Sequence, residues 1–377
     1  MRIGIEAQRV FRKEKHGMDF VAIELIRHLQ KLDTENQFYI FINEGKDRTC
    51  IEETENFKIV VFDAAYLVWE QLLLPQKVKE YKLDVLHCTS NTAPLFLSVP
   101  LVVTIHDLIY FENYPLFQSG YTSYQRFGNM YRRWLVYRLV GKAMRIITVS
   151  NFERDNFKDH FAQLDMQKLK TVYNGVSDHF KPTHSEKQLT AVKERYALPD
   201  QFVFFMGNTD PKKNSFNTIL GFLKASAQLP ESCKLIVADF NTDQQALLVR
   251  EKEWIKYGDR IQSIGYVLNT DMSALLGLAE ALLYTSRRES FGLPIIEAMA
   301  SGLPVITSTT SSMPEIAGKA AIQVDPENNE EIAKALVNLL TNIELRKELI
   351  HLGIERAKEF KWMLSAQKTL AIYKECE

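Results

Sequence analysis

The chain of 377 residues lacks the features that mark several classes of protein. Its four cysteines, Cys50, Cys88, Cys233 and Cys376, have neither metal-ligand nor redox spacing, and a chain of this length does not need disulfides. The formal net charge of -1 gives no overall attraction to nucleic acid or to acidic lipid. We therefore expect reduced thiols, a cytoplasmic protein and no nucleic-acid partner.

Long apolar runs are also scarce. The opening residues Met1–Glu6 reach charged side chains too early for a signal peptide. The longest uncharged stretch, Val85–His106 with histidine counted as neutral, contains polar residues and two prolines, so it is a poor membrane span. Any contact with a membrane is then expected to be peripheral, at the cytosolic face of the inner membrane.

Metal-binding patterns are missing as well. The sequence has no Asp-x-Asp and no His/Cys cluster with ligand spacing. We therefore expect no metal ion and no other cofactor. Lysines and helix dipoles would have to neutralise any anionic group that the protein handles.

Short apolar runs alternate with amphipathic helical patterns along the whole chain. The first expected strands are Arg2–Ile5, Phe38–Ile42, Lys58–Phe62, Asp84–Cys88, Pro100–Ile105, Arg145–Val149 and Leu169–Val172. After a polar stretch at 182–187 the expected strands are Phe202–Met206, Lys234–Ala238, Arg260–Ile264, Ala281–Tyr284, Pro304–Thr307 and Ala321–Val324. Amphipathic helices are expected between them, such as Asp19–Lys31, Asn214–Ala227 and Glu330–Leu340. Such alternation predicts an α/β protein of two doubly wound, Rossmann-like domains, which would bind ligands at the carboxyl ends of their strands.

The segment 285–305 carries the strongest local signal. Gly292 permits an unusual turn after the expected strand, Pro294 suits the first turn of a helix, and Gly302 is placed to end that helix. A helix start with free amide groups is suited to an anion such as a diphosphate. Glu289 precedes the helix and Glu297 lies about one turn into it. Carboxylates so close to phosphates suit neutral hydroxyl partners, such as those of a sugar or ribose. The alternative is two surface glutamates at an ordinary helix start.

This segment resembles the signature of the family 4 glycosyltransferases, which have the GT-B fold of two Rossmann-like domains facing a cleft. The signature has two glutamates separated by seven residues, with Phe-Gly-Leu-Pro between them, and continues Glu-Ala-Met-Ala-x-Gly-x-Pro-Val. The resemblance covers most of the chain through further segments, namely Ser150–Phe152, Tyr173–Val176, Gly265–Val267, Met313–Ile316 and Phe360–Trp362. It implies an acceptor-side domain over 1–183, a nucleotide-sugar-binding domain over 184–360, and a last helix over 361–377 that crosses back.

The resemblance also implies roles for individual residues. Glu297 would hold the donor ribose and Glu289 would lie against the donor sugar. Backbone amides at Phe291, Gly292 and Leu293 would meet sugar hydroxyls and phosphate, and Val267 would meet the nucleobase.

A basic turn follows the strand expected at Phe202–Met206. Gly207, Lys212 and Lys213 suit a diphosphate, and Lys213 matches the lysine of the family. Asn208 stands where relatives often have an arginine, and Lys212 is the candidate substitute for it. The alternative is a solvated basic turn.

In the first half of the chain, His106 ends the strand Pro100–Ile105, where the family has a His-Asp beside the donor sugar. A lone histidine is more often structural, and Asp107 is expected to orient the loop. Gly17 matches a glycine of the family's loop near the phosphates, although a glycine pair is absent.

A stretch without Asp or Glu runs from Asn113 to Phe152, and its segment 121–145 is rich in arginine and in aromatic residues. It is either a helix that lies on an anionic membrane or one that packs its aromatic side chains in the N-terminal domain.

We expect a retaining hexosyltransferase that uses a nucleoside diphosphate sugar, with Glu289, His106 and Lys213 at the reaction centre. GDP-mannose is the favoured donor; UDP-glucose, UDP-galactose and N-acetylated donors remain open. The acceptor is expected to be a glycan or lipid-linked glycan of surface polysaccharide or lipopolysaccharide assembly. The alternatives are a sugar-nucleotide epimerase or hydrolase of the same fold, and a non-catalytic sugar-nucleotide-binding partner subunit.

Overall fold

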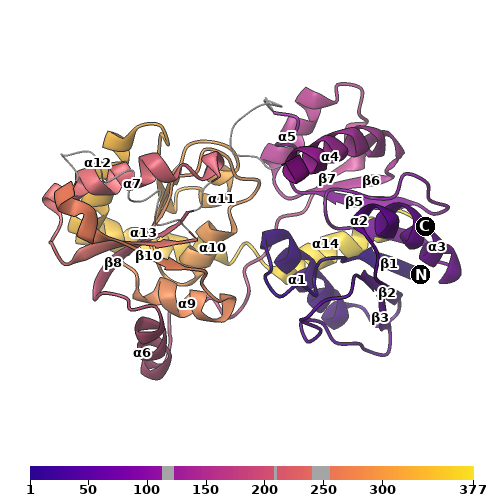
Figure 1. Ribbon diagram of the computed structural model, residues 1–377, viewed down its shortest axis with the longest axis horizontal. Coiled ribbons are helices and arrows are strands. Elements are labelled where there is room, and N and C mark those ends of the chain that lie inside the picture. Colours follow the sequence, from indigo (N-terminus) through magenta and orange to yellow (C-terminus); the bar gives the residue numbers. More distant parts are fainter. Residues whose placement is uncertain (113–122, 208–209, 240–254) are drawn as a thin grey trace. The chain divides into compact units, whose positions relative to one another are not determined.

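The computed structural model of the protein describes residues 1–112, 123–207, 210–239 and 255–377 (Figure 1). The chain forms two compact units, the first made of Met1–Gly175 with Lys361–Glu377 and the second of Val176–Phe360. The first passage between them falls after Gly175, inside the segment Tyr173–Val176 that resembles the family's interdomain segment, and not at the expected bound of 183. Gly175 is packed in unit 1, since a Cβ there would lie 2.1 Å from the backbone nitrogen of Trp362. Val176 already donates to Phe360 O, at 3.0 Å, within unit 2.

Unit 1 is built on a seven-stranded sheet in the order β3-β2-β1-β4-β5-β6-β7, in which all paired strands are parallel. Its strands are β1 (Arg2–Glu6), β2 (Gln37–Ile42), β3 (Phe57–Val61), β4 (Val85–Cys88), β5 (Leu101–Ile105), β6 (Arg145–Thr148) and β7 (Leu169–Thr171). The order reverses between β1 and β4, and ligands of open α/β sheets bind at such a point, beyond the carboxyl ends of the strands.

Helices cover both faces of this sheet. They are α1 (Gly17–Leu32), α2 (Tyr66–Val68), the π-helix η1 (Trp69–Leu73), α3 (Leu74–Glu80), α4 (Ser123–Lys142), α5 (Asn151–His160) and α14 (Trp362–Lys374). The last helix, α14, packs beside α1, as the yellow and indigo helices of Figure 1 show. Ile40 contributes to the core beneath α1 and α14, while its neighbour Phe41 contributes to the core on the opposite face. The C-terminal helix thus belongs to the core of unit 1.

Unit 2 has a six-stranded parallel sheet in the order β10-β9-β8-β11-β12-β13, so its order reverses between β8 and β11. Its strands are β8 (Gln201–Met206), β9 (Cys233–Ala238), β10 (Ile261–Gly265), β11 (Ala281–Tyr284), β12 (Val305–Ser308) and β13 (Ala321–Val324). Its α-helices are α6 (Glu186–Arg195), α7 (Ser215–Ala225), α9 (Asn269–Leu278), α10 (Leu293–Ala300), α11 (Met313–Ala317), α12 (Asn329–Thr341) and α13 (Ile343–Ala357).

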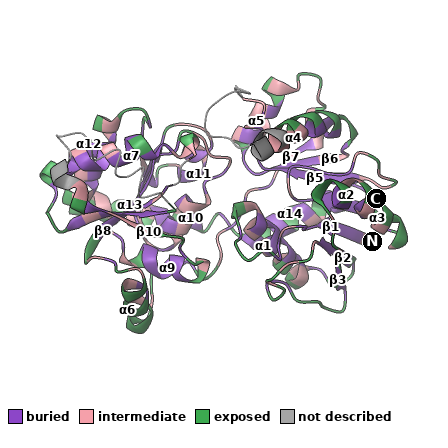
Figure 2. Ribbon diagram, in the orientation of Figure 1, coloured by how far each residue is buried: buried purple, intermediate pink, exposed green. Residues whose placement is uncertain are grey.

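The strand expectations from the sequence are confirmed in both units, and no strand end differs by more than one residue. The central strands are buried along most of their length, as Figure 2 shows in purple. Within the described ranges, no helix is both long enough and apolar enough to cross a membrane.

Candidate active site

The loop between β11 and α10 turns sharply at Gly292. This residue caps α10 in the left-handed region, at φ 96° and ψ 50°, and its carbonyl accepts from Ile295 N at 3.0 Å. Pro294 occupies the first turn and donates no hydrogen bond, and Gly302, at φ 73°, follows the end of the helix. Because first-turn amides have no partner inside a helix, the turn at Phe291, Gly292 and Leu293 offers backbone donors at the positive end of the α10 dipole.

Two serines from the segment after β12 brace this loop. Ser311 Oγ accepts from Glu289 N at 3.0 Å, while Ser312 Oγ donates to Glu289 O at 2.9 Å and to Phe291 O at 3.1 Å. The Phe291 ring is buried against Phe360, with ring centroids 5.8 Å apart, so only its backbone can serve a ligand. Neither serine was predicted from the sequence. The feature that could have indicated them is a pair of hydroxyl residues directly before the short helix α11.

Lys213 and Glu289 form an ion pair at the candidate site of unit 2. Lys213 Nζ lies 2.8 Å from Glu289 Oε1 and donates to Tyr284 Oη at 3.0 Å. Lys213 ends the short 3₁₀ turn η3 (Pro211–Lys213) after β8, and the buried Tyr284 ends β11. The pair therefore lies at the carboxyl ends of β8 and β11, where the strand order reverses.

The next residue, Asn214, fixes this turn against the β11 loop. It adopts the left-handed region, at φ 55°, and its side chain donates to Thr285 O at 2.9 Å and to Pro326 O at 2.6 Å. An asparagine tolerates this conformation better than most side chains do. The position of Lys213 is thus set by the fold and not only by its ion pair.

The electrostatics keep Glu289 ionised. Burial opposes ionisation, but the charge of Lys213, hydrogen bonds from Lys213 and Ser286, and the charge of Lys212 together lower the pKa of Glu289 below its usual value. An ionised carboxylate only accepts hydrogen bonds, so Glu289 is suited to hydroxyl donors of a ligand.

Glu297 lies one turn into α10 and behaves in the opposite way. Burial raises the pKa of Glu297 from 4.5 to about 7. No side chain in the described part of the chain donates to its carboxylate or pairs with it. The two glutamates of one short motif are thus distinct, because a lysine holds one as an anion whereas burial leaves the other only partly ionised at neutral pH.

The basic turn lies beside this pair. The Lys212 ammonium is 3.5 Å from Asp210 Oδ2, about a third of its side chain is exposed, and its charge acts on Glu289. Lys212 O accepts from Arg287 N at 2.7 Å, which joins the turn to the loop after β11. Gly207 is buried, and a Cβ there would lie 2.5 Å from Phe205 Cε1. Asn208 lies outside the described residues.

The expected base-binding loop follows β10. Gly265 adopts a positive φ of 67°, after which Tyr266 and Leu268 are exposed and Val267 is buried. Leu268 N donates to Tyr196 Oη at 3.1 Å, which anchors the loop to the end of α6. With its side chain buried, Val267 can meet a ligand only through its backbone.

In unit 1, His106 follows β5 and is buried. Its Nε2 lies 2.9 Å from Thr89 O, so this nitrogen carries the hydrogen, and its backbone nitrogen donates to Asn91 Oδ1 at 2.6 Å. Burial lowers the pKa of His106, against the opposing effects of the Thr89 carbonyl and Asp107. His106 is therefore a neutral imidazole at neutral pH. Asp107 Oδ1 accepts from Ile109 N at 3.4 Å within the loop.

Gly17 is the first residue of α1 and is exposed. A Cβ at this position would meet nothing within 4 Å, so unit 1 itself does not require a glycine there. The helix is capped by Asp19, whose carboxylate accepts from His16 N at 2.9 Å. The role of Gly17 at the phosphates stays a prediction.

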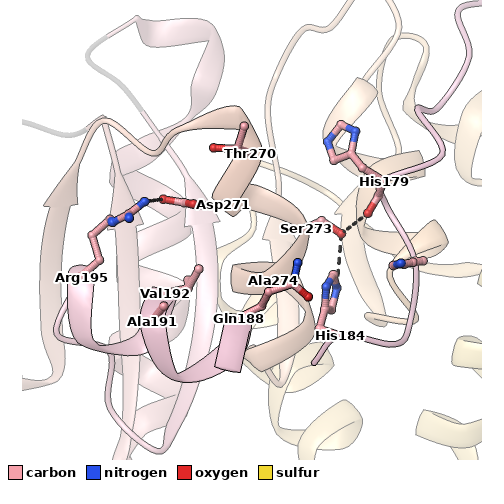
Figure 3. A pocket seen from close by; sticks show the side chains of 11 residues that line it. His179, His184, Gln188, Ala191, Val192, Arg195, Thr270, Asp271, Ser273 and Ala274 are labelled. Atoms are coloured by element: carbon pink, nitrogen blue, oxygen red, sulfur yellow. Dashed lines mark hydrogen bonds and ion pairs between the residues drawn. The ribbon is translucent and has the colours of Figure 1, made fainter. Parts of the chain in front are cut away.

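A pocket opens elsewhere in unit 2, between α6, α9 and the segment before α6 (Figure 3). Ser273 Oγ donates to His179 O at 2.7 Å and lies 3.3 Å from His184 Nε2, and Arg195 pairs with Asp271 on the other side. None of the expected donor-binding residues lines this pocket. The described residues also contain no group of three or more His, Cys, Asp or Glu side chains placed to hold a metal ion.

Two family models account for most of the chain. The model described as Glycosyltransferase Family 4 matches residues 16–180, and the model described as Glycosyl transferases group 1 matches residues 187–356. The chain belongs to the family 4 glycosyltransferases. This glycosyltransferase is 27% identical over 322 residues to O-antigen chain mannosyltransferase B of Escherichia coli, covering 81% of this chain and 78% of that protein. It is 26% identical over 279 residues to an alpha-D-kanosaminyltransferase of Streptomyces kanamyceticus, covering 70% and 69%.

Solved structures show the same fold. Anabaena HepE in complex with UDP and glucose superposes with a TM-score of 0.75 at 18% identity, over 100% of both chains. WaaG, a glycosyltransferase involved in lipopolysaccharide biosynthesis, gives a TM-score of 0.73 at 15% identity, covering 98% of this chain and 99% of that one. The glycosyltransferase therefore has the GT-B fold.

Proposed function

We propose that this glycosyltransferase moves a hexose from a nucleoside diphosphate sugar to a hydroxyl group of a glycan acceptor, with retention of the anomeric configuration. The observation that carries the proposal is the Lys213–Glu289 pair, 2.8 Å apart in front of the α10 helix start. The pair places an ammonium group that can bind phosphate beside a carboxylate that can accept hydrogen bonds from sugar hydroxyls. It lies where doubly wound parallel sheets bind nucleotides.

Each part of the donor has a matching group in unit 2. Lys212, Lys213 and the α10 amides suit the diphosphate, because two ammonium groups and a helix dipole concentrate positive charge there. Glu289 suits the hydroxyls of the donor sugar and Glu297 those of the ribose. The backbone at Val267 suits the base.

In the proposed reaction, the bond between the anomeric carbon and the diphosphate breaks and its electron pair leaves with the phosphate. The acceptor oxygen bonds to the same face of that carbon, and its proton passes to a departing phosphate oxygen. Lys213 and the helix start stabilise the charge that develops on the leaving group, which is the role of preorganised donors in transfer reactions. No metal ion is needed in this scheme.

For the donor sugar we favour mannose from GDP-mannose. Several relatives are named mannosyltransferases, among them RfbU of Salmonella typhimurium at 27% identity over 251 residues. The HepE structure contains UDP and glucose, so UDP-glucose is the main competitor. A thermal-shift screen over GDP, UDP, ADP and their sugars separates the two, because a ligand that binds the folded state raises the melting temperature. A shift with UDP compounds alone would overturn the mannose assignment.

The activity test uses purified protein, a labelled donor and an oligosaccharide acceptor, with the product's linkage read by NMR. We expect the new glycosidic bond to have the same anomeric configuration as the sugar of the donor. We also expect Glu289→Gln to abolish transfer. Glu359→Gln is the matched control, since Glu359 is an exposed partner of Arg356. Conversion of the donor in the absence of acceptor, at the same rate as in its presence, would instead identify an epimerase or hydrolase.

A lipid-linked acceptor is consistent with the surface of α4. Within the described part of this helix, Leu135 and Leu139 are buried against the sheet, whereas Met130, Trp134 and Tyr137 are exposed. The Arg138 guanidinium lies 4.3 Å from the centre of the Trp134 ring. The helix thus has buried apolar residues on one side and exposed aromatic residues on another, and Figure 2 shows both buried and exposed positions along it. Such a side suits an anionic membrane surface.

Liposome sedimentation tests the membrane contact. We expect binding to vesicles with anionic lipid and weaker binding to neutral ones, reduced by combining Trp134→Gln with Tyr137→Gln. Tyr266→Gln removes an exposed aromatic side chain from unit 2 and serves as the control. Equal, negligible sedimentation with both vesicle types would refute the membrane contact.

A further inference from the structure

A buried carboxylate in unit 1 has no part in the donor site. Glu70 lies on the π-helix η1 and is only 3% exposed. Its Oε1 accepts from Gln71 Nε2 at 3.2 Å and from Tyr131 Oη at 3.3 Å. Its Oε2 is buried without a hydrogen-bond partner. A buried polar atom without a partner is costly, so a native protein that keeps one needs a reason.

The surroundings of this oxygen are rich in hydroxyl groups. Tyr66 and Thr92 lie beside Glu70, and their hydroxyls hydrogen-bond each other. Tyr66 is 37% exposed and Leu67 is 40% exposed, so the outer wall of the cluster faces solvent. A sugar ring has hydroxyl groups for such oxygens and apolar C–H faces for such side chains.

The cluster lies at the ligand-binding edge of the sheet of unit 1. Thr92 belongs to the loop after β4, and the charge of Glu6, which ends β1, acts on both Glu70 and Tyr66. The charge of Arg9 acts on both Tyr66 and His106. Glu70 therefore shares one region with His106, at the carboxyl ends of β1, β4 and β5, where the strand order reverses.

The π-helix η1 places Glu70 at this edge of the sheet. Within η1 the π-helical turn accommodates an extra residue, and such turns are frequent at functional sites. The neighbouring Gln71 is fully engaged, because its Nε2 donates to Ala93 O at 3.1 Å and its Oε1 accepts from Leu95 N at 3.1 Å. Gln71 attaches the turn to the loop after β4, whereas Glu70 Oε2 accepts no hydrogen bond from the described residues.

We propose that Glu70, with the hydroxyls of Tyr66 and Thr92, binds hydroxyl groups of a neutral acceptor sugar on unit 1. This inference rests on the proposed transferase function. Burial raises the pKa of Glu70 to about 7, against the opposing effects of the Thr92, Tyr131 and Tyr66 hydroxyls, and burial also raises the pKa of Glu6. A phosphate would oppose the ionisation of both carboxyl groups further, so the sugar bound here is uncharged. The phosphate of a lipid-linked acceptor would lie instead toward the cations of α4.

The test is a steady-state comparison of the full-length enzyme with Glu70→Gln, which keeps the shape and removes the charge. We expect the acceptor KM to rise about tenfold or more, as for loss of a hydrogen bond to a charged group, with the donor KM changed less than twofold. Glu80→Gln is the matched control, since Glu80 is an exposed partner of Lys77 on α3. An unchanged acceptor KM, or equal changes in both KM values, would overturn the proposal.

Two further measurements keep the outcome unambiguous. If Glu70→Gln fails to fold, Tyr66→Phe and Thr92→Val must raise the acceptor KM selectively, and their failure to do so would count against the subsite. Nucleotide binding to the wild-type protein separates the two proposals. A wild-type protein that binds no nucleotide and transfers no sugar refutes the transferase function, whereas an active wild type with a normal Glu70→Gln variant refutes only the acceptor subsite.

Discussion

Replacing Lys213 by methionine is expected to lower both stability and turnover, for separable reasons. The side chains of Lys213 and Glu289 are only 17% and 12% exposed, so the variant leaves a carboxylate in a poorly solvated place without its cation. Breaking a buried pair costs about 3–5 kcal/mol, and the residual exposure of this pair reduces that to roughly 2–3 kcal/mol. For a unit of this size we expect a fall in melting temperature of roughly 5–10 °C.

The loss in turnover comes from the leaving group and not from instability. Removing one preorganised donor from a developing charge costs about 10²–10³ in kcat. The double variant with Glu289→Gln leaves no unpaired charge, so it should regain most of the melting temperature and remain inactive. Lys224→Met, in the last turn of α7, breaks a partly exposed ion pair with Glu330 and is the control for both measurements.

The assays are calorimetry and transfer to an oligosaccharide under saturating donor. The reasoning is refuted if Lys213→Met keeps wild-type kcat, since the leaving group would then not depend on this ammonium. It is also refuted if the double variant recovers both melting temperature and turnover, because Lys213 would then serve only to hold Glu289.

Five further predictions concern the proposed site. Because burial raises the pKa of Glu297 to about 7, its ionisation should destabilise the donor-free protein as pH rises from about 4.5 to 7, and Glu297→Gln should remove that part of the fall in calorimetry and keep the part due to Glu70, whose pKa burial also raises to about 7. Ribose hydroxyls favour the ionised form, so affinity for an intact nucleotide sugar should increase over the same range by titration calorimetry, and not in Glu297→Gln. Ser312→Ala removes a hydrogen bond from each of two loop carbonyls and should cost about 1–3 kcal/mol in denaturant unfolding, with a higher donor KM; an unchanged donor KM would exclude a bracing role. Gly292→Ala should cost about 1–2 kcal/mol at φ 96° and weaken nucleotide binding, whereas Gly17→Ala should leave stability unchanged. Transfer should proceed undiminished in excess chelator, and a strict metal requirement would refute the metal-free scheme.

The fold was predictable because buried parallel strands appear in a sequence as continuous apolar runs. Strands such as Ala281–Tyr284 and Ala321–Val324 have the expected ends. The boundary between the units was harder to predict, because the polar stretch at 182–187 marks a surface segment of unit 2 and not a linker. Gly175, where the chain leaves unit 1, packs against a helix that comes almost two hundred residues later.

The site was predictable only where its residues are close in sequence or carried by the family's motif. Gly292 and Glu297 followed from the loop and helix start alone. The contact of Lys213 with Glu289 spans 76 positions and depends on β8 lying next to β11, which local pattern does not show; the resemblance implied only that both residues serve the donor. Ser311 and Glu70 were missed for the same reason, since their partners come from other strand ends or helices.

The two motif glutamates have opposite pKa shifts, which suit different roles in the proposed donor site. Glu289 is an anion because the charges of Lys213 and Lys212 outweigh the effect of burial, although Lys212 also lies 3.5 Å from Asp210 Oδ2. Glu297 has no such partner among the described residues, and burial raises its pKa to about 7, so it is only partly ionised at neutral pH. In the proposed scheme, Glu297 therefore adds only part of a negative charge before the diphosphate binds, and the ribose hydroxyls then favour its ionisation. A second permanent anion at position 297 would repel the phosphates, so the absence of a cation beside Glu297 among the described residues favours donor binding.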